Sequence, residues 1–437
     1  VFLIGTSLGF TRRLSMFVSG VFSLGVMVLG PQVLTIEYEP VPRGFALPLV
    51  LCAIGLALHG RNRAASLAAT AAMLYHAPTT AAFWLVFAVL LWRAREWKPL
   101  AIPALGLALL VAFSRLQPGL AERQPLFAIV SPAVEALQKM RAAYNFVSLW
   151  PRELTVHYTS LAGVCVLALW RLRSRLSVTH WIVFAGLLGA GVLSAPFSLA
   201  TLEGLRWSLI PQFQPARAML FVTSLGIILA AAAAIHAAAG RNYAETFAWM
   251  LIPFLLPVHK LLTPPYTVTE ALLVAGLAAA ATAAISVHML SPRRAAAALA
   301  MAGLAAYFAI PLIGGIQNYP ALWNPNIVGV AEWARAYTSR DAVFLFPKSL
   351  KDLHPGIFRA ESRRAVYVDW KGGGQVNYFE DLALEWHARW KAVILREASD
   401  AELAARGVDY IIVELKDIRH GVLPVYSNAG YAVYPTH

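Results

Sequence analysis

The segment of residues 218–238 reads AMLFVTSLGIILAAAAAIHAA and contains no Asp, Glu, Lys or Arg. A helix rises about 1.5 Å per residue, so about 20 apolar residues cross the hydrocarbon core of a bilayer. This segment therefore predicts a transmembrane helix. The whole chain has the same character, because 59% of its residues are hydrophobic, 14% are charged and its mean hydropathy is +0.60. Such a composition is typical of a protein whose surface faces lipid.

Segments of this kind recur throughout residues 1–315, and we expect about 11 transmembrane helices there. Their centres lie near Phe22, Leu51, Ala69, Phe87, Leu107, Val164, Leu188, Leu229, Phe254, Ala279 and Leu304. Residues 316–437 read as ordinary globular sequence. We therefore predict a polytopic α-helical membrane bundle over residues 1–315 and a small soluble α/β domain over residues 316–437. Because Val1 lies inside an apolar run, we also expect a truncated N-terminus, with membrane segments before it.

The distribution of charge predicts how the bundle is oriented. Residues 1–315 hold 22 Lys and Arg against 9 Glu and no Asp, whereas residues 316–437 hold 14 charges of each sign. The basic residues occupy every second connection: Arg12/Arg13, Arg61/Arg63, Arg93/Arg95/Lys98, Arg171/Arg173/Arg175, Arg241 and Arg293/Arg294. Cytoplasmic loops carry such an excess, so we expect these connections in the cytoplasm and the C-terminal domain on the extracytoplasmic side. This explains the net charge of +13 without a nucleic-acid partner.

The other connections hold the few charged groups that could carry chemistry. In the first of them, Glu37 and Glu39 are two residues apart, so their carboxylates point to the same side of an extended chain. They could share a divalent metal ion or act as base and orienting group, which makes them the catalytic and metal-ligand candidates. Arg43 could hold an anion beside them. The alternative is an exposed polar turn that ends at Pro40 and Pro42.

Other polar residues on this side are candidates for substrate binding: Arg43, His76, Glu203, Arg206 and Arg217. His76 begins a tight turn, residues 76–79, between two predicted helices, and a hydrogen-bonded helix terminus is the alternative there. Arg217 opens the helix of residues 218–238 and could grip a lipid phosphate bidentately. Alternatively, it extends toward the lipid headgroups.

The connection of residues 115–153 is too long for a simple loop. Ser131 and Pro132 supply an N-cap and a first-turn proline, and apolar residues recur after them at helical spacing. We predict an amphipathic helix that lies at the outer membrane interface. Packing of this helix against the bundle is the alternative.

The tail alternates between strand and helix signals, as in a small α/β domain. Predicted helices cover residues 328–338, 379–391 and 400–406. Predicted strands cover residues 342–346, 365–369, 409–414 and 431–434. The last of these strands follows the turn Asn428-Ala429-Gly430 and is expected at an edge of the sheet.

The densest polar cluster of the tail supplies five further site candidates: Arg359, Arg364, Asp369, Lys371 and Arg389. Glycines at 372–374 follow part of this cluster, but neither GxxxxGK[ST] nor GxGxxG is present, so a phosphate loop is a weak interpretation. Trp386 and Trp390 share a predicted helix face with Arg389. The two indoles could stack on a sugar or cover the core, and we favour the core.

Four features of the sequence form a combined pattern. They are the run Glu39-Pro-Val-Pro-Arg43, a Gly60-Arg61 connection, a helix that ends at His76 and the Gln-Pro-Ala-Arg217 segment. Together they resemble bacterial polytopic membrane proteins allied to the C-type (GT-C) glycosyltransferases. The tail looks like the extracytoplasmic domain that follows the membrane module in that family. The likeness covers most of the chain through diffuse motifs, and many of the similar proteins are uncharacterised.

The resemblance implies transfer of a sugar from a polyprenyl-phosphate donor at the outer face of the bacterial inner membrane, with membrane lipid as the other partner. Family members use an acidic residue, usually Asp, in the first external loop as base or metal ligand. This chain has no Asp before Asp341, so Glu37 or Glu39 takes that place or the acid lies in a preceding segment. Arg43 and Arg217 would hold the donor phosphate. The alternatives are a lipid-linked sugar transporter or flippase and a non-catalytic membrane assembly protein.

Overall fold

The computed structural model describes residues 1–38, 41–116, 127–258, 261–291, 295–316, 323–348, 351–394, 399–419 and 421–436. Its contacts divide the chain into two compact units. The helical unit comprises Val1–Pro118, Tyr144–Leu205 and Phe213–Pro320. The C-terminal unit comprises Gly119–Ala143, Arg206–Gln212 and Ala321–His437. Two short segments from the predicted membrane part thus belong with the tail.

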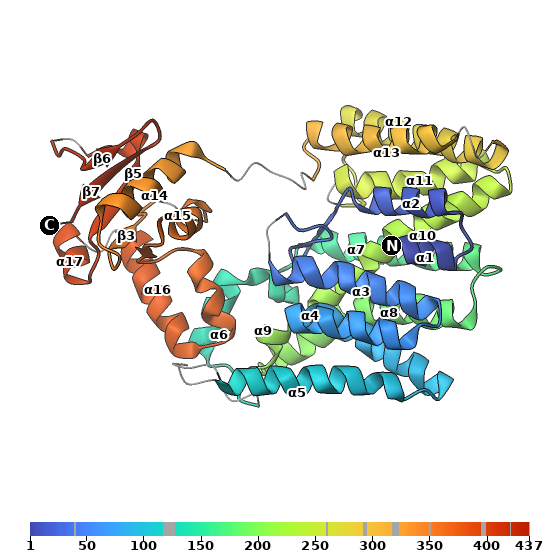
Figure 1. The fold of residues 1–437 in the computed structure, drawn as a ribbon, viewed down its shortest axis with the longest axis horizontal. Coiled ribbons are helices and arrows are strands. Elements are labelled where there is room, and N and C mark those ends of the chain that lie inside the picture. Colours follow the sequence, from blue (N-terminus) through green and yellow to red (C-terminus); the bar gives the residue numbers. More distant parts are fainter. Residues whose placement is uncertain are drawn as a thin grey trace. The chain divides into compact units, whose positions relative to one another are not determined.

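The main helices of the helical unit are α1 (Phe2–Ser7), α2 (Arg12–Phe22), α3 (Pro42–Leu58), α4 (Asn62–Ala94), α5 (Ala101–Leu116), α7 (Arg152–Leu172), α8 (Val178–Ser198), α10 (Met219–Ala239), α11 (Tyr243–Val258), α12 (Val268–Leu290) and α13 (Ala295–Leu312). The unit also contains a small hairpin, β1 (Met27–Val28) with β2 (Val33–Leu34), and the short turns η1 (Lys98–Leu100), η3 (Val147–Leu149), η4 (Leu199–Gly204) and η5 (Pro215–Ala218). Successive helices from α10 to α13 lie side by side (Figure 1).

Six helices in the described part of the chain are long and apolar enough to cross a membrane, so the protein is a multi-pass membrane protein. The count of 11 crossings is therefore wrong by this measure. The centres near Ala69 and Phe87 both lie on α4, in two parts that are each shorter than about 20 residues. The segment around Phe22 is a helix of 11 residues, and the apolar helices Pro42–Leu58, Lys98–Phe113 and Tyr243–Val258 are also short of a full crossing.

Helix α10 forms the centre of the helical unit and packs against α7, α8, α11 and α12. Its apolar window is 94% buried, against 28–44% for the other candidate spans. The alanines at 230–234 are fully buried, and small side chains of this kind let neighbouring helices approach closely. This apolar segment therefore faces protein, whereas the less buried helices present apolar surface to lipid.

Helix α4 reverses direction at His76. The backbone there is non-helical (φ −159°, ψ 91°), and Pro78 follows within two residues. A straight helix of 33 residues would separate its ends by about 50 Å. Instead, Asn62 Nδ2 donates to Glu96 Oε2 at 2.6 Å and Ser66 Oγ donates to Pro99 O at 2.6 Å. The turn predicted at residues 76–79 is confirmed, with two antiparallel helical halves on either side of it.

The two sets of connections lie at opposite ends of the helices. Hydrogen bonds of 2.6–3.2 Å join the basic connections at what we call the basic end: Ser7 with His180, Thr11 with His288, Asn62 with Glu96 and Arg171 with Glu245. At the opposite end, Tyr158 donates to Leu29 O at 2.6 Å and Leu262 N donates to His157 at 3.0 Å. The predicted alternation of connections between two ends is thus present in the bundle.

The C-terminal unit contains a five-stranded sheet with the strand order β4-β3-β5-β7-β6. Its strands are β3 (Val343–Leu345), β4 (Ala365–Val366), β5 (Tyr410–Glu414), β6 (Tyr426–Ser427) and β7 (Tyr431–Pro435). β3 pairs in parallel with β4 and β5, whereas β7 runs antiparallel to β5 and β6. The remaining elements are α6 (Pro132–Arg141), η2 (Ala143–Asn145), α14 (Pro325–Tyr337), α15 (His354–Ser362), η6 (Lys371–Asn377), α16 (Glu380–Ile394), α17 (Asp400–Ala405), η7 (Leu415–Asp417) and the one-turn α9 (Ile210–Phe213). The last residue of α9, Phe213, belongs to the helical unit.

Side chains alternate between the two faces of this sheet, as the pleat requires. Phe344 packs with α14 and α15, in a cluster that includes Phe358. Its neighbour Leu345 packs on the other face with α16 and α17, in a cluster that includes Trp386 and Leu403. The chain thus covers both faces of the sheet with helices, which confirms the small α/β domain.

The strand of residues 431–434 is not at an edge, so this prediction was wrong. β7 lies between β5 and β6, and Tyr431, Ala432, Val433 and Tyr434 are all buried. The edge strand on this side of the sheet is β6, which has only two residues, too few to show a period of two in the sequence.

The predicted amphipathic helix exists as α6, but it packs within the C-terminal unit. Ser131 caps it by accepting a hydrogen bond from Val134 N. Gln138 Nε2 donates to Val376 O at 3.0 Å, and Leu137 joins the cluster around Trp386. The apolar face of the helix is thus covered by the small domain, a partner that the sequence did not predict.

Candidate functional site

A charged pair forms the first part of the candidate site in the helical unit. Glu37 lies just after the β1–β2 hairpin, and Arg43 lies in the first turn of α3. Arg43 Nε bonds to Glu37 Oε1, and Arg43 Nη2 lies 3.4 Å from Glu37 Oε2. The Glu37 side chain is 6% exposed and that of Arg43 is 30% exposed. Glu37 therefore fixes the orientation of a guanidinium group whose remaining face is open.

The second part comes from two distant segments. Arg217 Nη1 donates to His76 Nε2 at 3.0 Å. Arg217 lies in η5, directly before α10, and His76 lies at the reversal of α4. Gln214 begins η5 in the left-handed backbone region (φ 47°), and its carbonyl accepts from Arg217 N at 3.0 Å. The sharp turn at Gln214 thus directs the Arg217 side chain toward the His76 imidazole.

The two ring nitrogens of His76 contact different residues. A guanidinium group has no acceptor, so Nε2 of His76 accepts from Arg217. Nδ1 lies 2.8 Å from Thr79 Oγ1 and accepts from Thr79 N at 3.3 Å. The charges of Arg217 and Arg43 both act on this ring. Arg217 therefore contacts this histidine directly, whereas Arg43 acts on it as a nearby charge.

The structure brings together four of the candidates from the membrane part: Glu37, Arg43, His76 and Arg217. It does not bring Glu203 and Arg206 to them. Glu203 accepts from Ser148 N at 3.1 Å, and Arg206 belongs to the C-terminal unit, where it lies 3.8 Å from Glu135. Thr79 and Gln214 support the site from positions beside His76 and Arg217.

The metal prediction rests on Glu37 and Glu39. Glu39 lies outside the described residues. Both carboxylate oxygens of Glu37 face the Arg43 guanidinium, which would repel a divalent cation. Within the described part of the chain, no group of three or more His, Cys, Asp or Glu side chains could hold a metal ion. Glu37 as arranged here does not fit a metal ligand.

In the C-terminal unit, Arg364 has a structural contact set. Its side chain is buried, and its guanidinium donates to Thr338 O and Arg335 O, each at 2.9 Å, and to Thr338 Oγ1 at 3.2 Å. Thr338 is the C-cap residue of α14. Arg364 therefore satisfies the last carbonyl groups of that helix, which would otherwise lie buried without donors.

Asp369 and Arg359 lie together, and the other candidates do not join them in one group. Asp369 Oδ2 lies 3.7 Å from Arg359 Nη2, and Asp369 Oδ1 accepts from Gly372 N at 2.6 Å. Arg389 bonds to Glu385 and lies over the Tyr367 ring at 5.2 Å. Lys371 is exposed.

The glycines at 372–374 serve packing. A Cβ atom on Gly373 would lie 2.5 Å from Trp386 Cε2, so the indole requires a glycine there. Trp386 is buried and stacks on Trp390 at 5.8 Å. The preferred prediction, that these indoles belong to the core, is confirmed for Trp386.

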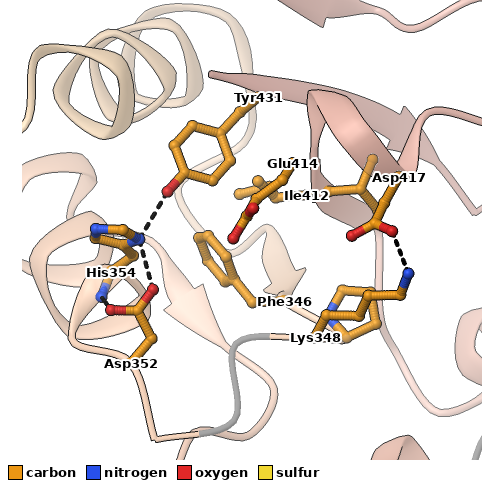
Figure 2. A pocket seen from close by; sticks show the side chains of 10 residues that line it. Phe346, Lys348, Asp352, His354, Ile412, Glu414, Asp417 and Tyr431 are labelled. Atoms are coloured by element: carbon orange, nitrogen blue, oxygen red, sulfur yellow. Dashed lines mark hydrogen bonds and ion pairs between the residues drawn. The ribbon is translucent and has the colours of Figure 1, made fainter.

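A polar pocket at the sheet was missed in the sequence (Figure 2). His354 Nδ1 lies 2.6 Å from Asp352 Oδ2 and 2.7 Å from the Tyr431 hydroxyl, while Lys348 pairs with Asp417 across the pocket. The pocket has a volume of about 20 Å³, which is room for about one water molecule. Burial, with the charges of Asp352 and Glu414, raises the pKa of Tyr431 to about 12. The Asp-Leu-His spacing at residues 352–354 was the only signal in the sequence.

Comparison with known proteins adds one match. A model of a domain of unknown function, DUF6798, matches residues 325–393, which include Arg359, Arg364, Asp369, Lys371 and Arg389. No curated protein and no solved structure shows a significant match. The chain is thus similar to that domain over α14 to α16.

Proposed function

We propose that this protein is a GT-C-like glycosyltransferase that transfers a sugar from a polyprenyl-phosphate donor at the extracytoplasmic face of the bacterial inner membrane. One observation carries the proposal: Arg43 and Arg217, from segments far apart in the sequence, both act on His76 at one end of the helical unit. Glu37 pairs with Arg43. The guanidinium groups of Arg43 and Arg217 suit a phosphate.

The position of the group suits a lipid-linked donor. It lies where the apolar helices α3, α4 and α10 begin or reverse, opposite the basic end. A polyprenyl chain can stay beside the apolar helices while its phosphate reaches the arginines. Guanidinium groups bind phosphate oxygens bidentately, which fixes the leaving group as well as its charge.

The chemistry assigns a role to each residue. The acceptor hydroxyl oxygen attacks the anomeric carbon of the donor sugar, and the bond from that carbon to the phosphate oxygen breaks. The electron pair of that bond leaves with the polyprenyl phosphate, whose negative charge Arg43 and Arg217 stabilise. The hydroxyl proton goes to a carboxylate. Because Glu37 is engaged with Arg43, we assign it to positioning, and Glu39 is the proposed base.

The test uses the full chain in nanodiscs, with polyprenyl-phosphate sugars labelled in the sugar and a glycolipid fraction as acceptor. We expect label in a new product. Arg217→Ala should raise KM for the donor about tenfold to a hundredfold, as expected for the loss of a charge-assisted hydrogen bond. Glu39→Gln should lower kcat. Arg173→Ala, at the basic end, is the matched control and should leave both parameters unchanged.

Two results would overturn the proposal. The first is an absence of transfer together with silent Glu37→Gln and Glu39→Gln variants in cells. The second is movement of intact lipid-linked sugar across proteoliposomes without covalent transfer, which would favour a flippase. A protein captured through the tail, with no change in lipid-linked sugars, would favour the assembly role.

A further inference from the structure

The carboxyl ends of β3 and β4 form a place where ligands bind in many α/β sheets. These strands are parallel neighbours. The chain leaves β3 toward α15, which packs on the Phe344 face, and leaves β4 toward α16, which packs on the Leu345 face. Ligands of open α/β sheets bind outside the carboxyl ends of the strands, so the side chains that follow β3 and β4 are candidates for ligand binding.

Asp369, three residues after β4, has a buried carboxylate that lacks one partner. Its side chain is 4% exposed. Oδ1 accepts from Gly372 N, whereas Oδ2 is buried and accepts no hydrogen bond from any residue that the structure describes. The nearest cation, Arg359 Nη2, lies 3.7 Å away, and its side chain is 50% exposed. A buried carboxylate oxygen without a donor is destabilising, so a ligand that supplies a hydroxyl donor would be favoured here.

Cations surround the neighbouring Trp370. Lys351 Nζ lies 4.9 Å from the centre of its ring, and Arg141 Cζ lies 4.8 Å from it. Arg141 Nε also donates to Trp370 O at 2.8 Å. Together with Arg359, these groups place three cations near Asp369 and Trp370, which favours an anionic ligand.

We propose that the side chains after β3 and β4 bind an anion that also carries a hydroxyl group, of the kind a sugar phosphate presents. The hydroxyl group donates to Asp369 Oδ2, and the phosphate is held by Arg359 and Lys351. This site goes beyond the proposed transferase function and shares no residue with the group around His76. The headgroup can come from a free sugar phosphate or from a lipid-linked one.

The test is isothermal titration of the full chain in detergent with glucose 1-phosphate. Glucose and inorganic phosphate are separate arms, and nanodiscs that contain polyprenyl-phosphate glucose test the lipid-linked source. Asp369→Asn keeps Oδ1 as acceptor for Gly372 N but turns the other oxygen into a donor beside Arg359. We expect it to weaken binding at least about tenfold, and Arg359→Gln to do the same. Arg340→Ala removes an exposed charge from the amino end of β3 and should bind like the wild type.

The site is supported if glucose 1-phosphate or the lipid-linked glucose binds more tightly than glucose or phosphate alone. Which of the two binds shows whether the headgroup comes from a free or a lipid-linked sugar phosphate. Thermal unfolding shows whether the variants stay folded. If Asp369→Asn does not fold, the affinity of Arg359→Gln tests the proposal. Equal affinity of wild type and both variants would overturn the proposal. So would the absence of binding in both the soluble and the lipid-linked arm.

Discussion

The arginines of this chain differ in what their guanidinium groups contact. Arg364 is buried and donates to the carbonyl groups that end α14. Arg43 is held by a carboxylate and keeps an exposed face, and Arg217 reaches an imidazole. In a sequence all three are cations near aromatic or polar neighbours. Only the donors and acceptors around each one separate a helix cap from a group that is available to a ligand.

The first prediction concerns Gly373. Gly373→Ala should destabilise the C-terminal unit by about 1–3 kcal/mol, because the new Cβ atom would overlap Trp386. Gly374→Ala is the matched control, since a Cβ atom there meets nothing within 4 Å. Thermal unfolding of the full chain, followed by tryptophan fluorescence, measures both. Equal unfolding temperatures for the two variants would contradict the packing role of Gly373.

The second prediction concerns the pH dependence that Tyr431 confers. Its pKa is raised to about 12 in the folded protein, whereas a tyrosine in the unfolded chain ionises near pH 10. The folded state therefore holds this proton more tightly. The stability that it contributes is fully present below about pH 10 and is lost as the pH rises through about 12.

Tyr431→Phe should flatten the fall in the unfolding temperature between about pH 10 and 12. Tyr337→Phe is the matched control, because Tyr337 is 77% exposed. If both variants showed the wild-type pH profile, the burial of the Tyr431 hydroxyl would not govern alkaline stability. Below about pH 9, Tyr431→Phe should still lose the hydrogen bond to His354.

At the scale of elements, the best predictions came from residues with one strong local effect. Pro78 and the short polar turn predicted the reversal at His76, because a proline cannot continue a helix without losing a backbone donor. Ser131 and Pro132 likewise located the start of α6. In contrast, the partner of α6 was not predictable, since lipid and a small protein domain both favour an apolar helix face.

In the candidate site as well, the individual residues were predictable and their contacts were not. Arg43, His76 and Arg217 were chosen because charge is scarce away from the basic connections. Their convergence depends on which helices are neighbours, and an amino-acid pattern does not contain that information. Asp352, His354 and Tyr431 were missed because they come from separate elements of the sheet domain, and each is ordinary in its own segment.

The third prediction tests the reversal of α4. With Cys52 and Cys165 replaced by serine, cysteines at Asn62 and Glu96 should react with a short bismaleimide to give a cross-link. Their native side chains are 2.6 Å apart, whereas a continuous helix would hold them about 50 Å apart. A protease site engineered within the turn of residues 76–79 allows the chain to be cut after cross-linking. On electrophoresis, the cross-linked chain should then run as one band, because the two fragments stay joined. Asn62 paired with Thr79 is the control and should separate into two fragments.

At the scale of the whole molecule, the chain consists of a helical unit whose connections form two chemically distinct ends and of a mixed α/β unit. The basic end is joined by hydrogen bonds between different connections, some of them far apart in the sequence. The opposite end holds the arginine and histidine group. Because the excess of Lys and Arg marks the cytoplasmic side of membrane proteins, the two ends should face different compartments. The proposed transferase function needs this separation, since the donor headgroup must be reached from one side.

The last prediction measures this orientation. In a background without Cys52 and Cys165, we expect an impermeant maleimide to label Tyr38→Cys and Arg340→Cys in intact spheroplasts. Arg173→Cys should react only after the membrane is opened. Tyr38, Arg173 and Arg340 are all exposed, so the differences report the compartment and not burial. Labelling of Arg173→Cys from outside, with protection of Tyr38→Cys, would reverse the bundle and leave the arginine group on the wrong side for an extracytoplasmic donor. Labelling of Tyr38→Cys without Arg340→Cys would instead separate the tail from the compartment of that group.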